Sequence, residues 1–451
     1  MSVREEDSKW SSTGYSLHMV VSVAIYSVLL ILPAVLGLLQ DFPHKDIIQE
    51  LSDAILFICF MAMYLELILS GRIKALSAYA GIDLIMRIHR SVAKVLMILL
   101  LLHPFLVVRP WKSVPKAFGS LWELLFTLSM LPGIIAWILL LLLFLMAWNR
   151  NRLPLRYETW RITHGIGMLA MAALATYHVI IFGAHSNTLF ITLWTVLLVL
   201  SVITVLYIHV IQPFQRGPHP YRLVSNTQIG DGLWNVTIEP VQPYEFNFIA
   251  GQFVWLSVGE SAFSLNEHPF SIASCPADLP QISFIIKESG DFTSQLGKFH
   301  KGACAYIDGP HGNCTLTGRG GEGVCVIAGG AGIAPAMGIL RELHSTRDPR
   351  PVRLIYGANL ESELVLREEF TAISKNISFK EHLVLAKSSS GWDGLTGILD
   401  EPTLRKCLTD IERKDWLYYV WGPDVMMDSV VQTLHDWGVP QHRIVIERFD
   451  F

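Results

Sequence analysis

Charged residues are scarce in this chain, and the scarcity is confined to one half of it. Asp, Glu, Lys and Arg make up 16% of the 451 residues, whereas hydrophobic residues make up 51%. Soluble domains usually carry about a quarter charged residues. Long apolar runs continue to about Ile211, and the remainder has the composition of an ordinary soluble protein. The net charge of −4 gives no support for nucleic-acid binding, so we expect no nucleic acid among the partners.

Paired cysteines and a leader cleavage site are also missing. None of the six cysteines forms a CxxC pair, and five of them follow Ile211. This argues against a zinc site, a thiol redox motif or a disulfide framework, and it fits a reducing cytosol around the second half. No small-residue cleavage site follows the first apolar run, so we do not expect a cleaved signal peptide.

Long apolar segments are what the first half does contain. A helix needs about 20 apolar residues to cross the hydrocarbon core of a bilayer. Six segments qualify, at residues 17–39, 51–70, 88–108, 121–148, 162–182 and 189–211. The fourth contains Pro132-Gly133, where we expect a kink or a first turn that lies on the membrane surface.

Lysine and arginine are distributed unevenly over the loops between these segments. Eight follow the second and fourth segments, four follow the first and third, and none follows the fifth. Positive charge accumulates on the cytoplasmic side, so the even-numbered loops are predicted to lie inside. We therefore predict an integral protein of the plasma or inner membrane whose two termini and soluble half are cytoplasmic.

Histidines recur at one spacing in two of the segments. His89 and His103 lie in the third segment, His164 and His178 lie in the fifth, and both pairs are 14 residues apart. That spacing places two imidazoles on one face of a helix, about 21 Å apart along its axis. Two helices of the same direction then define two levels, His89 with His164 and His103 with His178.

The two levels predict two b-type haems. A haem takes one axial imidazole from each side, and a histidine inside a membrane segment is a functional hypothesis by default. The alternative is hydrogen bonding between helices by membrane histidines, which does not require the same spacing twice. Arg87, Arg90 and Lys94 flank His89; they would pair with haem propionates or extend to the lipid headgroups.

The second half changes its pattern once. From about Gln212, short alternating strands broken by Gly, Pro and Asn predict a small antiparallel barrel. From about Gly323, apolar strands alternate with helices, which predicts a parallel sheet with a nucleotide at the strand ends. The predicted domains are a membrane domain at 1–211, a barrel at 212–320 and a Rossmann-like α/β domain at 321–451.

A glycine-rich turn opens the last domain. Gly329, Gly330, Gly332 and Pro335 directly follow the strand VCVIA and begin a helix. Glycines let the backbone approach a pyrophosphate, and a helix N-terminus favours its charge. A glycine-rich turn without a ligand is the alternative, and the strand–turn–helix context favours nucleotide binding.

Taken together, these motifs resemble the NADPH oxidase and ferric reductase superfamily, which joins a six-helix bis-haem membrane domain to a ferredoxin-NADP reductase-like module. The resemblance covers nearly the whole chain. It rests on the histidine pairs, the glycine-rich turn and the aromatic C-terminus, and on three further motifs: His268-Pro269-Phe270-Ser271, Gly290-Asp291-Phe292-Thr293 and Asp308-Gly309-Pro310-His311-Gly312.

The resemblance implies roles for individual residues. His268, Pro269, Phe270 and Ser271 would hold the flavin ring and ribityl chain of FAD, with Ser271 near the flavin N5. Lys287 and the turn Gly290, Asp291, Phe292 and Thr293 would hold the FAD pyrophosphate. Gly422 and Pro423 would lie near the nicotinamide, and Phe451 would cover the flavin ring until nicotinamide displaces it.

Three departures from the family pattern stand out. Trp421 replaces the usual cysteine before Gly422-Pro423, which would alter how the nicotinamide ring is seated. The stretch Tyr356-Gly357-Ala358-Asn359 lacks the arginine that grips a 2′-phosphate, so NADPH and NADH both stay open. No second histidine stands one turn after His103, which weakens the case for an oxygen pocket beside the outer haem.

The expected activity is hydride transfer from NADPH or NADH to FAD, then single-electron transfer through both haems to an external acceptor. Six-coordinate haems leave no iron position for dioxygen, which favours superoxide or ferrous iron as products. Oxygen giving superoxide is the leading interpretation. The alternatives are a ferric-chelate reductase, a membrane electron donor to an external protein partner, and a flavin reductase on an inert lipid-embedded anchor. The four patterned histidines argue against the last.

Overall fold

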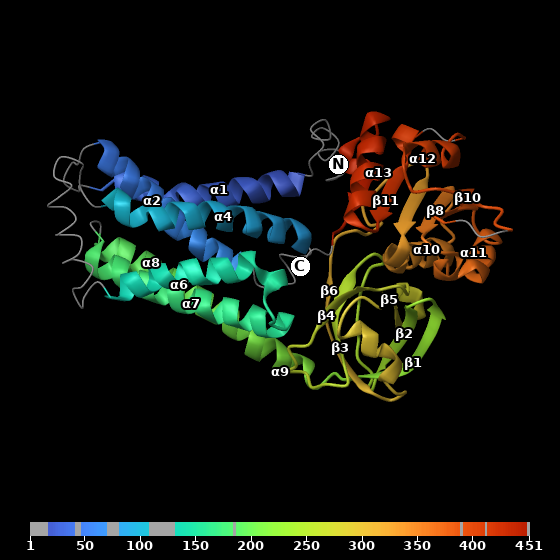
Figure 1. Cartoon of the computed structure of the whole chain (residues 1–451), viewed down its shortest axis with the longest axis horizontal. Helices are drawn as coiled ribbons and strands as arrows, with labels where there is room; N and C mark the ends of the chain where they lie inside the picture. The colour runs from blue at the N-terminus through green and yellow to red at the C-terminus, as the bar shows by residue number, and fades with distance from the viewer. Residues whose placement is uncertain are drawn as a thin grey trace, which may run out of the picture. The chain divides into compact units, whose positions relative to one another are not determined.

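A computed structural model describes residues 17–40, 47–69, 81–107, 131–183, 186–387, 391–410 and 413–448 (Figure 1). The chain divides into two compact units. One is helical and lies between Val20 and Ile211, and the other contains everything from Gln212 onward.

Long helices build the first unit. In the described residues they are α1 (Leu17–Leu38), α2 (Ile47–Leu69), α4 (Ile82–Val107), α6 (Leu131–Trp148), α7 (Tyr157–Phe182) and α8 (Thr188–Leu206). Each overlaps one predicted segment. The π-helical stretch Tyr207–Ile211 and the short helix α9 (Gln212–Arg216) continue α8.

Five of these helices, and not six, are long and apolar enough to cross a membrane. The exception among the described helices is α4, which carries Arg87, Arg90 and Lys94 in its first half. The predicted helical membrane region is confirmed. The described helices clearly include five candidate spans and do not clearly include the predicted sixth. In the described residues, Pro132 and Gly133 lie at the start of α6 (Leu131–Trp148). The beginning of that predicted segment, residues 121–130, lies outside the described residues.

The helical core is aromatic and contains polar contacts between helices. Phe57 of α2 stacks on Phe190 of α8, with ring centroids 4.7 Å apart. Tyr64 of α2 is hydrogen-bonded to Thr176 of α7. Outward side chains are apolar and exposed, as Val28 is at 66%. Apolar residues outside and polar residues inside are the arrangement that a lipid environment favours.

An antiparallel sheet begins the second unit. Its strands are β1 (Tyr221–Gly230), β2 (Leu233–Pro240), β3 (Phe253–Val258), β4 (His268–Ser271), β5 (Ile282–Lys287) and β6 (Cys304–His311), in the order β4-β3-β6-β1-β2-β5. Between the two ends of this order lies a single bridge, Ile272 to Phe284. The predicted barrel is therefore not closed, because β4 ends before it can form a ladder with β5.

A parallel sheet follows, as predicted. Its strands are β7 (Val324–Gly329), β8 (Val352–Ala358), β9 (Phe379–Leu385), β10 (Leu395–Thr396), β11 (Leu417–Trp421) and β12 (Ile444–Ile446), in the order β10-β9-β8-β7-β11-β12. Strands β8, β9 and β10 extend the sheet to one side of β7, and β11 and β12 extend it to the other side. The order in which strands are added therefore reverses at β7, which pairs with both β8 and β11. Ligands bind at such a switch point, beyond the carboxyl ends of the strands.

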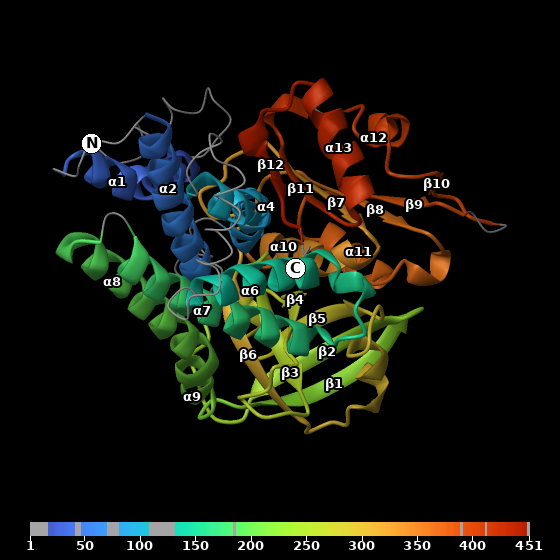
Figure 2. The same cartoon turned by 60° about the vertical axis from the view of Figure 1, so that its left-hand side comes forward.

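Helices cover both faces of this sheet (Figure 2). Helices α10 (Ile333–Ser345) and α11 (Arg367–Ser374) pack on one face, against Val326 and Tyr356. Helices α12 (Glu401–Cys407) and α13 (Asp424–Asp436) pack on the other, against Ile327 and Tyr418. Burial on both faces explains why the strand sequences are continuously apolar.

Arg341 of α10 joins the two sheets. It donates to the carbonyl oxygen of Ala273 at 2.8 Å and to the carboxylate of Glu369 at 2.6 and 2.8 Å. Burial works against its charge, but the bonds to Glu369 outweigh this, so the pKa of Arg341 is raised. A Cβ on Gly338 would lie 2.7 Å from the carbonyl oxygen of Ile272, so glycine permits this close approach. The two sheets therefore form one body around the pocket described below.

Candidate functional site

The four histidines occupy two helices of the first unit. Helix α4 carries His89 and His103, and α7 carries His164 and His178. In the part of the chain that the structure describes, no hydrogen bond joins two of these four side chains, and one of them, His89, makes an interhelical contact of the kind that the alternative describes, to Glu66 of α2. Their role as haem ligands stays a prediction.

The surroundings of the histidine rings fit a haem at each level. The Nδ1 atoms of His103, His164 and His178 are buried, and within the described residues they have no hydrogen-bond partner. A Cβ on Gly133 of α6 would lie 2.5 Å from Nδ1 of His178, so glycine makes room for the ring. The ring of Trp160 stacks on His164 with centroids 5.4 Å apart. Each level thus offers two imidazoles, the donor set of a bis-histidine haem.

One histidine has a carboxylate partner. Nδ1 of His89 lies 2.9 Å from Oε2 of Glu66 on α2. The sequence motifs did not single out Glu66. A signal was present, because an acidic residue inside an apolar segment is costly and marks a functional hypothesis.

The predicted flavin residues lie along β4 and the turn after β5. His268 stacks on Phe292, with centroids 4.5 Å apart, and its Nε2 is 2.7 Å from Oδ1 of Asn266. Pro269, Phe270 and Ser271 line a pocket, and Ser271 pairs with Phe253 of β3.

The Thr293 hydroxyl is used within its own turn. It accepts hydrogen bonds from the backbone N–H groups of Ser289 at 2.8 Å and Gly290 at 2.9 Å. The helix that begins there, Thr293–Lys298, is a 3₁₀ helix of six residues. Thr293 therefore shapes the backbone of the turn instead of presenting a free hydroxyl.

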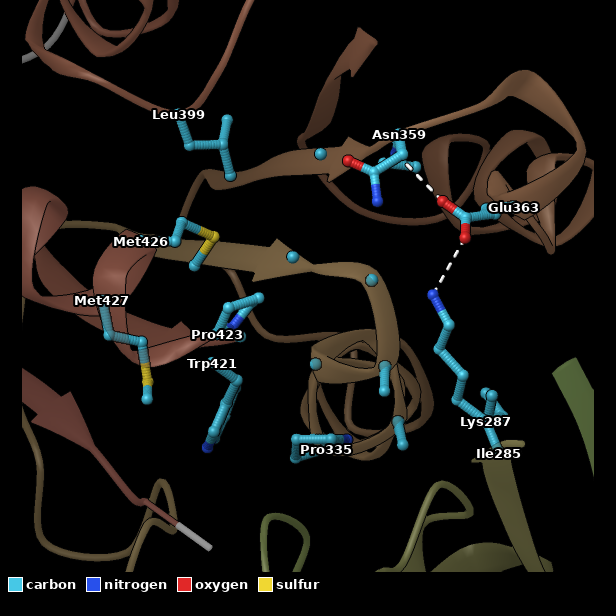
Figure 3. A pocket seen from close by; sticks show the side chains of 18 of the residues that line it. Ile285, Lys287, Pro335, Asn359, Glu363, Leu399, Trp421, Pro423, Met426 and Met427 are labelled. Atoms are coloured by element: carbon cyan, nitrogen blue, oxygen red, sulfur yellow. Dashed lines mark hydrogen bonds and ion pairs between the residues drawn. The ribbon is translucent and has the colours of Figure 1, made fainter. Parts of the chain in front are cut away.

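The pocket has a volume of about 650 Å³ and lies between the two sheets of this unit (Figure 3). Pockets of roughly 300–1,000 Å³ hold small molecules and cofactors. The lining comes from β4 and β5 on one side and from the ends of β7, β8 and β11 on the other. It includes Lys287, Thr293, Gly329, Gly330, Gly332, Pro335, Gly422 and Pro423, whereas His268, Gly290, Asp291 and Phe292 lie outside it.

The glycine turn is shaped by contact with the neighbouring strand. A Cβ on Gly332 would lie 2.3 Å from the carbonyl oxygen of Trp421, so no other residue fits there without movement. Gly330 has φ +53°, and a Cβ on it would meet nothing within 4 Å. Gly332 packs the turn against β11, whereas Gly330 leaves open space that faces the pocket.

Trp421 occupies the position where the family usually has cysteine. Its side chain is 2% exposed, stacks on Tyr419 at 5.3 Å and lines the pocket. In the described residues its indole Nε1 has no hydrogen-bond partner. The indole ring thus takes up space in the pocket at the end of β11.

Lys287 points toward the nucleotide side of the pocket. Its Nζ donates to Oε1 of Glu363 at 2.8 Å, and Oε2 of Glu363 accepts the backbone N–H of Asn359 at 3.0 Å (Figure 3). Burial opposes the charge on Glu363, but these hydrogen bonds outweigh it, so the pKa of Glu363 is lowered. Nothing in the sequence motifs indicated Glu363. Phe451, the predicted cover of the flavin, lies outside the described residues.

Comparisons with known families cover both units. Residues 55–176 match the family described as ferric reductase like transmembrane component. Residues 222–317 match an FAD-binding domain, and residues 326–432 match an oxidoreductase NAD-binding domain. The fold and these matches define a transmembrane oxidoreductase, a flavoprotein with FAD-binding and NAD-binding domains.

Similar proteins include the reductase component of propane 2-monooxygenase from Mycolicibacterium goodii, 28% identical over 222 residues, which are 48% of this chain and 63% of that protein. A component of the Na⁺-translocating NADH-quinone reductase from Pseudoalteromonas atlantica is 31% identical over 166 residues, 36% of this chain and 40% of that protein. This chain spans less than two-thirds of either relative. A ferredoxin NADP⁺ reductase structure from Neisseria gonorrhoeae has a TM-score of 0.45 at 20% identity, covering 51% of this chain and 97% of that one.

The order of the three family matches along the chain identifies the larger group. A ferric-reductase membrane component followed by FAD-binding and NAD-binding domains is the architecture of the NADPH oxidase and ferric reductase superfamily. The chain has this architecture, and the resemblance inferred from its sequence is confirmed.

Proposed function

We propose that this protein moves electrons across the membrane from NAD(P)H, through FAD and two b-type haems, to an acceptor on the opposite side. The proposal is supported by the positions of four histidines, His89 and His103 on α4 and His164 and His178 on α7, with the same 14-residue spacing on both helices. The proposed domains are the membrane domain at 1–211, the FAD domain at 212–320 and the NAD(P) domain at 321–451.

The proposal includes α4 as a sixth span. Its 26 residues would extend about 39 Å, more than the hydrocarbon core of about 30 Å. The basic residues lie in its first half, and the second half, from Val95, is apolar apart from His103. Arginine and lysine near the end of a span extend their charged groups to the interface. With six spans, both termini and the soluble domains lie in the cytoplasm, and His89 with His164 forms the inner level.

FAD, when bound, accepts a hydride and releases electrons one at a time, and bis-histidine haems carry single electrons. The chain positions these groups. Ser271 would offer a small hydroxyl to the flavin N5, and we propose Phe451 as the residue that would cover the ring. The turn at Gly330 and the end of β11 at Gly422 seat the nicotinamide nucleotide, NADPH or NADH.

The proposed acceptor is oxygen, reduced by one electron to superoxide. His103 and His178 would hold the outer haem from both sides, so oxygen would receive its electron without binding iron. The test is NAD(P)H-driven reduction of cytochrome c outside sealed vesicles, with and without superoxide dismutase. Inhibition by the dismutase is expected. Equal rates with and without it, together with anaerobic formation of ferrous chelate, would replace this acceptor by ferric iron.

A third possibility is electron delivery to an external protein. The loops expected on the outer side are short, which gives such a partner little surface. Steady NAD(P)H oxidation by purified protein with oxygen or ferric chelate alone would exclude the need for that partner.

Loss of the Lys287 charge together with the Thr293 hydroxyl is expected to weaken FAD binding. The lysine would face the diphosphate directly, and the hydroxyl holds the turn that approaches it. Hydrogen bonds to a charged group contribute about 1.5–3 kcal/mol each, so Lys287→Ala with Thr293→Val is expected to weaken binding at least tenfold. The measurement is titration of flavin-depleted protein with FAD, followed by flavin fluorescence.

Lys298→Ala with Thr371→Val is the matched control for this pair of changes. It removes the same two kinds of side chain at exposed positions that do not line the pocket, so FAD affinity is expected to hold. If the double variant stays within a factor of two of the unchanged protein, the diphosphate lies elsewhere.

A further inference from the structure

A buried carboxylate lies beside one of the four candidate haem ligands. Glu66 of α2 is 6% exposed. Its Oε1 accepts the hydroxyl of Tyr26 at 2.7 Å, and its Oε2 lies 2.9 Å from Nδ1 of His89. Three helices, α1, α2 and α4, thus contribute to one short chain of polar contacts.

The arrangement occurs at one histidine and not at the others. Within the described residues, the Nδ1 atoms of His103, His164 and His178 are buried without a hydrogen-bond partner. An acidic residue inside a membrane helix is costly and needs donors that balance it. Glu66 has two such donors, and one of them is the ring that would bind iron.

A carboxylate hydrogen-bonded to Nδ1 of a histidine determines how the other ring nitrogen, Nε2, can bind a metal. Accepting the Nδ1–H fixes the tautomer, so Nε2 is the nitrogen left for the metal. The same contact fixes the ring orientation and makes the imidazole a more basic ligand. A more basic axial ligand stabilises the oxidised iron and lowers its reduction potential.

On this basis we propose that Glu66 is a positioning residue that lowers the reduction potential of the haem held by His89 and His164 below that of the haem held by His103 and His178. The inference rests on the proposed function. It gives the electron path a direction. An electron that leaves the haem at His89 and His164 would oxidise that iron and reduce the iron at His103 and His178. This transfer would be favourable because the second haem has the higher reduction potential.

The test measures the potential of the first haem alone. His178→Leu is used as background because it leaves one candidate site, at His89 and His164. In that background Glu66→Gln keeps the size of the side chain and removes its charge. Second-sphere changes at metal sites have effects of about tenfold or more. We expect the one-electron equilibrium to shift at least tenfold toward the reduced haem, about 59 mV, in an optical redox titration.

Two further variants separate positioning from general disruption. Glu66→Asp keeps the charge and is expected to restore part of the shift. Tyr64→Phe removes a buried polar contact on the same helix, the one to Thr176, which touches no histidine; it is expected to leave the potential unchanged. Electron paramagnetic resonance of the oxidised haem gives a second signature, expected to change in Glu66→Gln and not in Tyr64→Phe.

The outcomes are distinct. Unchanged potential and resonance in haem-loaded Glu66→Gln, or an equal shift in Tyr64→Phe, overturn the inference and leave the proposed function intact. Loss of this haem from Glu66→Gln while Tyr64→Phe retains it supports the inference, because an unoriented ring binds iron less tightly. Absence of haem from the unchanged protein overturns the proposed function itself and is seen before any variant is made.

Discussion

With His178 replaced by leucine, the protein is expected to hold one haem instead of two and to lose reduction of the external acceptor. The remaining imidazole at that level, His103, cannot hold the group from both sides, and the electron path ends at the inner level. Oxidation of NAD(P)H with a soluble dye should continue, because the dye takes electrons from the flavin. Haem content is measured as pyridine haemochrome and the two activities in parallel assays.

His103→Leu is expected to reproduce this result, since the two side chains share one level. His209→Leu is the control. His209 lies in the stretch Tyr207–Ile211 that continues α8, and no histidine stands 14 residues from it. A His178→Leu protein that is fully active and holds two haems would remove the assignment of this pair.

Gly332→Ala is expected to impair NAD(P)H oxidation severely by displacing the glycine turn. The added Cβ would lie 2.3 Å from the carbonyl oxygen of Trp421, and because the nearest atoms are all backbone of Trp421 and Gly422, they cannot move aside easily. Overpacking of this kind costs about 1–3 kcal/mol of stability. We expect a lower melting temperature of the soluble unit and a large rise in KM for both coenzymes.

Gly330→Ala separates packing from ligand approach. Its Cβ meets no protein atom within 4 Å, although φ is +53°. The fold should survive with a cost of about 1 kcal/mol, while the methyl group obstructs the phosphates and raises KM. Gly320→Ala, also without neighbours within 4 Å, should change neither property. Normal KM values in Gly332→Ala and Gly330→Ala would place the nucleotide elsewhere.

Periodic and local features of this protein could be predicted from its sequence. Long, mainly apolar segments predicted α1, α2, α6, α7 and α8, because a membrane helix must satisfy its own backbone within one segment. The parallel sheet was predictable for a similar reason, since strand, glycine turn and helix follow one another directly at Gly329.

Features that depend on distant residues could not be predicted. The contact of Glu66 with His89 spans 23 residues, and that of Lys287 with Glu363 spans 76. Which acidic side chain reaches which base depends on how helices and strands pack, and residue types alone do not determine that. The open barrel has the same origin, because closure depends on whether β4 is long enough to pair with β5.

Helix α4 combines a charged first half with an apolar second half, so composition alone defines its span less clearly than those of the other long helices. The hydrogen bonds that the Thr293 hydroxyl accepts from Ser289 and Gly290 depend on the geometry of the turn, which the motif does not specify.

The central claim is that electrons from NAD(P)H reach two haems within this one chain. It is tested most directly by adding NAD(P)H to the purified, FAD-loaded protein without oxygen and recording the reduced-minus-oxidised spectrum. The account predicts bleaching of the flavin followed by the absorption of reduced low-spin b-type haem, in a ratio of two haems to one FAD. Bleaching of the flavin with no haem absorption, or haem that dithionite reduces and NAD(P)H does not, would contradict it.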